Sequence, residues 1–175
     1  MRLAARMPIS EVGVAELTRE AGISRVTFYD HYESPLDALV EALTEELDAI
    51  RRVDTAAHIA AEHPGLQIET ESMARLAEHV LEFRAVYEQA LLSGPKATLH
   101  YVLKDYFEQA QMEYLERTAL PNIPVGVSHR AAANYIAHGM VGSIELWLER
   151  GRETGRYVVP ELVAVITALR PEWWR

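Results

Sequence analysis

Apolar residues recur at intervals of three and four along almost the whole chain of 175 residues. The clearest example follows Pro35, where Leu36, Leu39, Leu43 and Leu47 would share one face of a helix. The sequence has no sustained alternation of apolar and polar residues, and it has no Asn-Gly or Asp-Gly hairpin turn. The pattern therefore predicts an all-α fold.

Capping residues and helix breakers divide this periodicity into long helical segments. Ser34 and Ser128 are suited to the N-cap position, and Gly151 is expected to stop the helix that follows Ser128. A loop is expected over residues 55–67, which contain His63-Pro64-Gly65. The expected long helices cover residues 35–50, 71–92 with a break near Phe83–Arg84, 96–117, 129–150 and 160–169.

Composition excludes several classes of protein. Without cysteine, the chain has no disulfide framework, no thiol nucleophile and no Cys-ligated zinc. Its most apolar stretch, residues 131–148, carries polar side chains and predicts a buried helix, so we expect a cytoplasmic protein with no membrane partner. The net charge of −9 argues at first sight against a nucleic-acid binder.

The first forty residues contain a helix-turn-helix pattern. A short helix is expected from Val14, and Gly22 follows it where a sharp turn needs a positive φ. Ile23 is expected to point inward, and Ser24 to cap a second short helix over residues 25–32. The polar side chains that this second helix would present are Arg25, Thr27, Tyr29 and His31.

The run Ala-Gly-Ile-Ser at 21–24, followed by Thr-Phe-Tyr-Asp-His-Tyr at 27–32, resembles the tetracycline-repressor (TetR) family of bacterial transcriptional regulators. The resemblance implies a helix-turn-helix DNA-binding domain over residues 1–48 and a helical effector-binding and dimerisation domain over residues 49–175. It implies a repressor that binds a palindromic DNA operator as a homodimer and responds to a small-molecule effector.

The resemblance also implies roles for single residues of the second helix. Tyr29 and His31 would contact the phosphate backbone, while Arg25 and Thr27 would face base edges or nearby phosphates, next to Ser24 at the helix start. The chain departs from the family pattern at three places. Gly13 stands for a capping Thr, Pro35 stands for a phosphate-contacting Lys, and residues 2–7 supply little more than one turn of the first helix.

The later helices contain candidates for a dimer interface and for an effector pocket. One side of the helix over residues 131–150 would face a partner subunit, because two glycines there permit close approach of another helix. The expected interface residues are Tyr135, His138, Gly139, Gly142, Leu146, Leu162 and Ile166. The expected pocket residues are His79, Phe83, Tyr87, Tyr106, Met140 and Trp147, for which ordinary core packing is the alternative.

Two other interpretations remain open at this point. The first is a dimeric ligand-binding helical protein whose shortened head does not bind DNA, which the acidic charge and Pro35 favour. The second is an all-helical enzyme, but the sequence has no His-Glu-x-x-His, Gly-x-Ser-x-Gly or phosphate-binding glycine motif. We therefore expect no enzyme activity, no cofactor and no metal. Residues 1–29 hold four Arg and three Glu, a net charge of +1, so the contact surface itself is not acidic.

Overall fold

The computed structural model describes residues 1–60, 66–92, 97–117 and 123–169. Every regular element within these ranges is a helix, which confirms the all-α prediction. The order is η1 (Ile9–Glu11), α1 (Val14–Ala21), α2 (Arg25–Tyr29), α3 (Pro35–Ala60), α4 (Leu66–Glu82), α5 (Arg84–Leu92), α6 (Ala97–Arg117), α7 (His129–Thr154) and α8 (Val159–Ala168).

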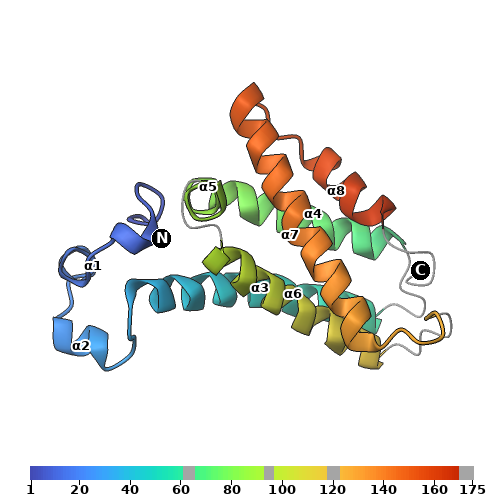
Figure 1. The fold of residues 1–175 in the computed structure, drawn as a ribbon, viewed down its shortest axis with the longest axis horizontal. Helices are drawn as coiled ribbons and strands as arrows, with labels where there is room; N and C mark the ends of the chain where they lie inside the picture. Colours follow the sequence, from blue (N-terminus) through green and yellow to red (C-terminus); the bar gives the residue numbers. More distant parts are fainter. Residues whose placement is uncertain (61–65, 93–96, 118–122, 170–175) are drawn as a thin grey trace.

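A small N-terminal head lies at one end of the molecule, and the longer helices form a bundle beyond it (Figure 1). Helix α3 leads out of the head and continues into the bundle, so one helix crosses the expected domain boundary at residue 48. Helix α7 packs against α5, α6 and α8, while α4 contacts α3 and α8. The bundle core includes fully buried Leu43, Tyr87, Leu103 and Leu148. The head is therefore coupled to the bundle mainly through α3.

The capping residues act as the sequence predicts. The Ser34 Oγ accepts a hydrogen bond from the Asp37 amide at 3.2 Å, and α3 begins at Pro35. The Ser128 Oγ accepts one from the Ala131 amide at 3.1 Å, and α7 begins at once. The expected break between Phe83 and its neighbour is also confirmed, since α4 ends at Glu82 and α5 begins at Arg84.

Two boundary predictions are wrong. Helix α7 passes through Gly151 and ends at Thr154, and the cap residue Gly155 has a φ of 70° that suits glycine. A Cβ on Gly151 would lie 2.2 Å from the Tyr157 ring, so this glycine makes room for an aromatic side chain. The loop expected over residues 55–67 is largely helical, because α3 continues to Ala60 and α4 begins at Leu66; residues 61–65 lie outside the described ranges.

The segment before α1 forms turns and one short 3-10 helix in place of a long first helix. Leu3, Ala4 and Val12 are buried all the same, so the segment supplies apolar support to the head. Arg2 also forms an ion pair with Glu20 of α1 at 3.0 Å. Among the described residues, no helix combines the length and apolar character needed to cross a membrane.

Candidate functional site

The helix-turn-helix is built around a glycine turn and a serine cap. Gly22 has φ 70° and ψ 26°, and its amide donates to the Thr18 carbonyl, which closes α1. Ser24 then opens α2, because its Oγ accepts a hydrogen bond from the Thr27 amide at 3.0 Å. The prediction of helix, glycine turn and capped second helix is thus confirmed, except that α2 ends at Tyr29 and not at Tyr32.

An aromatic anchor fixes α2 to the head. Phe28 is 1% exposed, and the rings of Tyr29 and Tyr32 each lie 5.5 Å from its ring. Its neighbour Tyr29 is 59% exposed, because one residue of a helix rotates the side chain by about 100°. Burial of Phe28 therefore directs Tyr29 outward.

The five residues predicted to contact DNA are all exposed and lie within or beside α2. They are Ser24, Arg25, Thr27, Tyr29 and His31. The hydroxyl groups of Ser24 and Thr27 are 2.9 Å apart, so each already has a neighbour within the head. Arg25, Tyr29 and His31 supply a cation, a phenol and an imidazole that could bind phosphate oxygens or base edges.

Two residues of this region are exposed in a way that the sequence interpretation missed. Ile23 was expected to point inward, and this is wrong, because it is 41% exposed. Val26 is 71% exposed on the same helix-turn-helix unit. Exposed apolar groups here could contact thymine methyl groups. Within α2 itself, the buried side chain is Phe28.

Tyr32 links the end of the head to α3. Its hydroxyl donates to the Glu41 Oε1 at 3.0 Å, and this hydrogen bond to a carboxylate raises the pKa of Tyr32. Tyr32 and Glu41 are nine residues apart and belong to different segments, so helical periodicity in the sequence did not predict this contact. The contact makes the orientation of the head depend on the first turns of α3.

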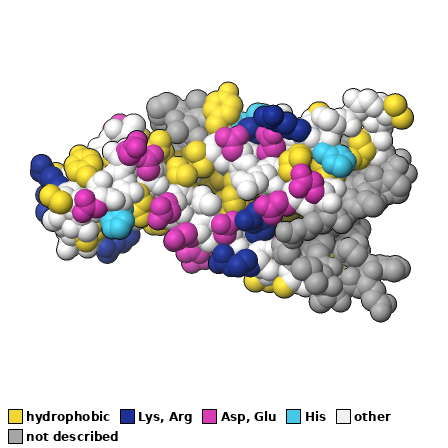
Figure 2. Space-filling model, turned by 90° about the horizontal axis from the view of Figure 1, so that it is seen from below, with side chains coloured by type: hydrophobic (Ala, Val, Ile, Leu, Met, Phe, Trp, Pro, Cys, Tyr) yellow, Lys and Arg dark blue, Asp and Glu magenta, His cyan; other side chains and the backbone are white. Residues whose placement is uncertain are grey.

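The charges on the head and on α3 differ. Figure 2 shows basic side chains at the head end of the molecule and acidic side chains along the neighbouring part of the bundle. Exposed Glu41, Glu45 and Glu46 lie on α3, whereas Arg19 and Arg25 are exposed on the head. Exposed Asp30 and Glu33 also place acidic charge on the head, next to Tyr29 and His31.

A cavity of about 100 Å³ lies between α3, α4, α6 and α7. Two of the six predicted pocket residues, Tyr106 and Met140, line it. Ligand pockets typically span about 300–1,000 Å³, so this cavity would have to widen to admit most ligands. Burial is the main cause of a raised Tyr106 pKa, so its hydroxyl stays protonated and can donate a hydrogen bond.

The other four predicted pocket residues do not line this cavity. His79 Nε2 lies 2.9 Å from the Tyr87 hydroxyl, and the Phe83 ring lies 5.0 Å from the His79 ring. Trp147 donates its Nε1–H to the Val158 carbonyl at 3.1 Å. These residues hold α4, α5, α7 and the loop before α8 together.

Charged residues, which the sequence interpretation omitted, form part of the cavity wall. Arg51 and Asp54 of α3 line the cavity together with Ser72 and Gln111. Arg51 forms an ion pair with Glu113 at 3.1 Å, and Asp54 pairs with Arg75. Charged residues occur along much of α3, so the sequence pattern did not single out Arg51 and Asp54.

The outward side of α7 and α8 carries an exposed apolar surface. Tyr135 is 69% exposed and Leu146 is 56% exposed, and a hollow of about 530 Å³ lies between the two helices. The hollow is lined in part by His138, Gly139 and Leu169. Of the two α8 residues predicted for the interface, Leu162 is buried in the core of its own chain and Ile166 is 7% exposed, so Val165 and Leu169 form the exposed side.

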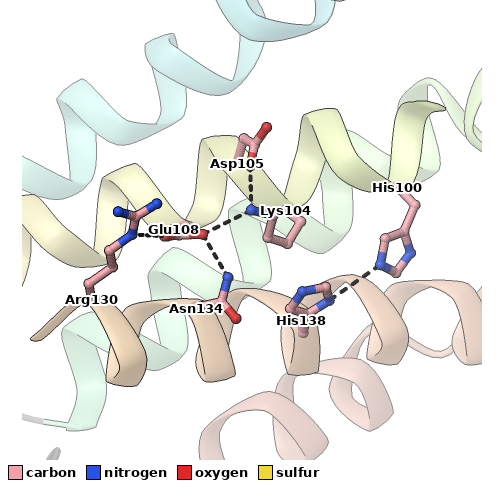
Figure 3. A network of polar contacts seen from close by, with 7 residues as sticks. All are labelled: His100, Lys104, Asp105, Glu108, Arg130, Asn134 and His138. Carbon is pink, nitrogen blue, oxygen red and sulfur yellow. Dashed lines mark hydrogen bonds and ion pairs between the residues drawn. The ribbon is translucent and has the colours of Figure 1, made fainter. Parts of the chain in front are cut away.

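Helices α6 and α7 also share a network of polar contacts (Figure 3). Glu108 accepts a hydrogen bond from the Asn134 Nδ2 at 2.8 Å and pairs with Lys104 at 2.9 Å and with Arg130 at 3.6 Å. These contacts lower the Glu108 pKa, with the Asn134 hydrogen bond as the largest cause. Within the described ranges, no group of three or more His, Asp or Glu side chains is arranged to bind a metal ion.

Comparison with solved structures shows a likeness in fold. The fold is similar to the crystal structure of RolR without ligand, with a TM-score of 0.56, 20% sequence identity, and coverage of 97% of this chain and 85% of RolR. At this level of identity, the likeness shows a shared, TetR-like fold. No family model matches the chain, and no curated protein matches it.

Proposed function

We propose that the chain is a TetR-type transcriptional regulator that binds a palindromic DNA operator as a homodimer and responds to a small-molecule effector. One observation carries the proposal. The buried Phe28 holds a capped helix so that Arg25, Tyr29 and His31 are exposed together. The TetR-like fold supports the same function.

Dimerisation supports operator binding because two heads related by a two-fold axis can bind two half-sites. The proposed interface is the outward side of α7 and α8, where Tyr135, Leu146 and Leu169 are exposed. Gly139 and Gly142 would let a partner helix approach, since nothing lies within 4 Å of a Cβ at either position. We propose a repressor, in which the effector releases the operator.

The proposed regulation passes through α3. This helix carries cavity-lining Arg51 and Asp54 near one end and contacts Tyr32 of the head through Glu41 near the other. An effector that widens the cavity would change the tilt of α3 and hence the separation of the two heads. Such a ligand acts only if its affinity differs between the two head separations.

Selection of genomic fragments by the purified protein, followed by salt titration, tests this function. We expect enrichment of a palindromic sequence whose affinity falls as salt rises. The absence of both an enriched palindrome and detectable DNA affinity at low salt would contradict the proposal.

The second candidate is a dimeric ligand-binding protein that does not bind DNA. It is favoured by the acidic residues beside the contact surface, including exposed Asp30, Glu33 and Asp37. A dimer that binds small molecules but selects no DNA in the same experiment would support it.

A further inference from the structure

Two histidines from different helices face one another at the junction of α6 and α7. Figure 3 shows His100 of α6 and His138 of α7 with their rings directed toward each other. His100 Nε2 lies 3.5 Å from His138 Nδ1, and the ring centres are 5.6 Å apart. In the single chain the His100 side chain is partly exposed and His138 is exposed, so ions in solvent can reach the pair.

The separation of the two nitrogens matches a metal chelate. Two imidazole nitrogens bound to one tetrahedral Zn²⁺ at about 2.0–2.1 Å each lie roughly 3.3–3.4 Å apart. The observed 3.5 Å is close to that value, although it is long for a hydrogen bond. The ring centres are 5.6 Å apart, so the two nitrogens face one another nearly head-on, and both rings would have to tilt to bind one ion.

Glu145 fixes which nitrogen of His100 is free to bind the ion. Its Oε1 lies 2.8 Å from His100 Nδ1, and a carboxylate can only accept, so the proton of neutral His100 resides on Nδ1. The lone pair then lies on Nε2, the atom that faces His138. This carboxylate–histidine arrangement is the one that commonly orients metal-binding histidines in proteins.

The nearby positive charge does not oppose a cation. Lys104 lies one turn along α6 from His100, and its ammonium is neutralised by Glu108 at 2.9 Å and by Asp105. Glu145 adds a negative charge directly beside His100.

We propose that His100 and His138 form a two-histidine site for a late first-row divalent cation such as Zn²⁺, with Glu145 as a positioning residue. Imidazole nitrogens suit this class of metal, and water completes the coordination. The bound ion joins α6 to α7. Because His138 also lines the hollow between α7 and α8, the ion lies at the edge of the proposed dimer surface. The site does not depend on DNA binding.

Calorimetric titration of the metal-free full chain with Zn²⁺ tests the site. We expect one Zn²⁺ site per chain, whose affinity falls at least tenfold in His100→Asn and in His138→Asn. His129→Asn is the matched control, because His129 is an exposed histidine at the start of α7 and should leave the affinity unchanged. Circular dichroism of each variant checks that the helices remain.

A second readout counts the ligands. The electron paramagnetic resonance spectrum of the Cu²⁺-loaded chain should show coupling to two imidazole nitrogens, and to only one in either variant. Glu145→Ala should weaken Zn²⁺ binding by about tenfold or more, whereas retained affinity would remove its positioning role. Absence of Zn²⁺ binding by the wild type, or full affinity in either histidine variant, would overturn the site.

Discussion

At residue scale, Tyr29 is the most direct test of the contact surface. Its phenol is exposed, and its orientation follows from the burial of the adjacent Phe28. Tyr29→Phe removes only the hydroxyl, so we expect DNA affinity to fall by about 1 kcal/mol, or roughly fivefold, for operator and unrelated DNA alike. Fluorescence anisotropy measures both affinities. Tyr101→Phe, at an exposed tyrosine of α6, should change neither, and unchanged affinity in Tyr29→Phe would remove this phosphate contact.

His79 makes stability depend on pH. Burial lowers its pKa in the folded chain, so the unfolded chain binds the proton more readily below about pH 6.5. The free energy of unfolding should therefore fall as pH decreases from 7 to 5.5, with a contribution of at most about 1.4 kcal/mol per pH unit from this group. Urea unfolding at both pH values measures the loss.

The variant His79→Gln isolates this contribution because a Gln amide can still bond the Tyr87 hydroxyl but does not titrate. We expect a smaller loss of stability on acidification in His79→Gln than in wild type. His129→Gln, at an exposed position, should behave as wild type. Equal losses in wild type and His79→Gln would contradict the assignment.

The roles of some residues could be predicted from their neighbours in the sequence, whereas the contacts of others could not. Ser24, Ser34 and Ser128 cap helices as expected, because a cap depends only on atoms within three residues. The partners of His79, Trp147 and Arg51 depend on how separate helices pack. For this reason, the sequence placed Tyr106 and Met140 at the cavity but missed Arg51 and Asp54.

At element scale, Gly151 is a residue that the sequence singled out but whose role was predicted wrongly. A glycine near the end of an apolar period resembles a helix stop, yet here it faces Tyr157 inside a continuous α7. The Tyr157 ring is held by Arg84, 4.7 Å from the ring centre, by Trp147 at 6.0 Å between ring centres, and by the hydroxyl contact with Glu88. The periodicity of apolar residues cannot predict a contact such as that between Gly151 and Tyr157.

This packing predicts that Gly151→Ala destabilises the chain. Alanine normally stabilises a helix interior by about 1 kcal/mol over glycine, but its Cβ would overlap the restrained Tyr157 ring. We expect a net loss of about 1–3 kcal/mol in chemical denaturation. In a Tyr157→Ala background the same substitution should become neutral or stabilising. A destabilisation of equal size in both backgrounds would show that Tyr157 is not the cause.

At the scale of the whole molecule, the net charge of −9 becomes compatible with DNA binding once its location is known. The acidic residues of α3 lie beside the head, and the head exposes a few side chains, such as Arg25 and Tyr29, that are proposed to contact DNA. The all-α architecture was predictable because helical periodicity is a local property. The relative placement of head and bundle was not, because it depends on long-range packing around α3.

The proposed dimer gives the last prediction. Leu146 is 56% exposed on α7, so Leu146→Glu should leave the single chain folded while placing a charge in the proposed interface. We expect sedimentation velocity to show a shift from dimer to monomer, with helicity unchanged. Val53→Glu is the matched control, since Val53 is 53% exposed on α3, and it should leave the dimer intact. Because each monomer would bring only one head to the operator, Leu146→Glu should also lose most of its operator affinity. A Leu146→Glu protein that remains dimeric would place the interface elsewhere.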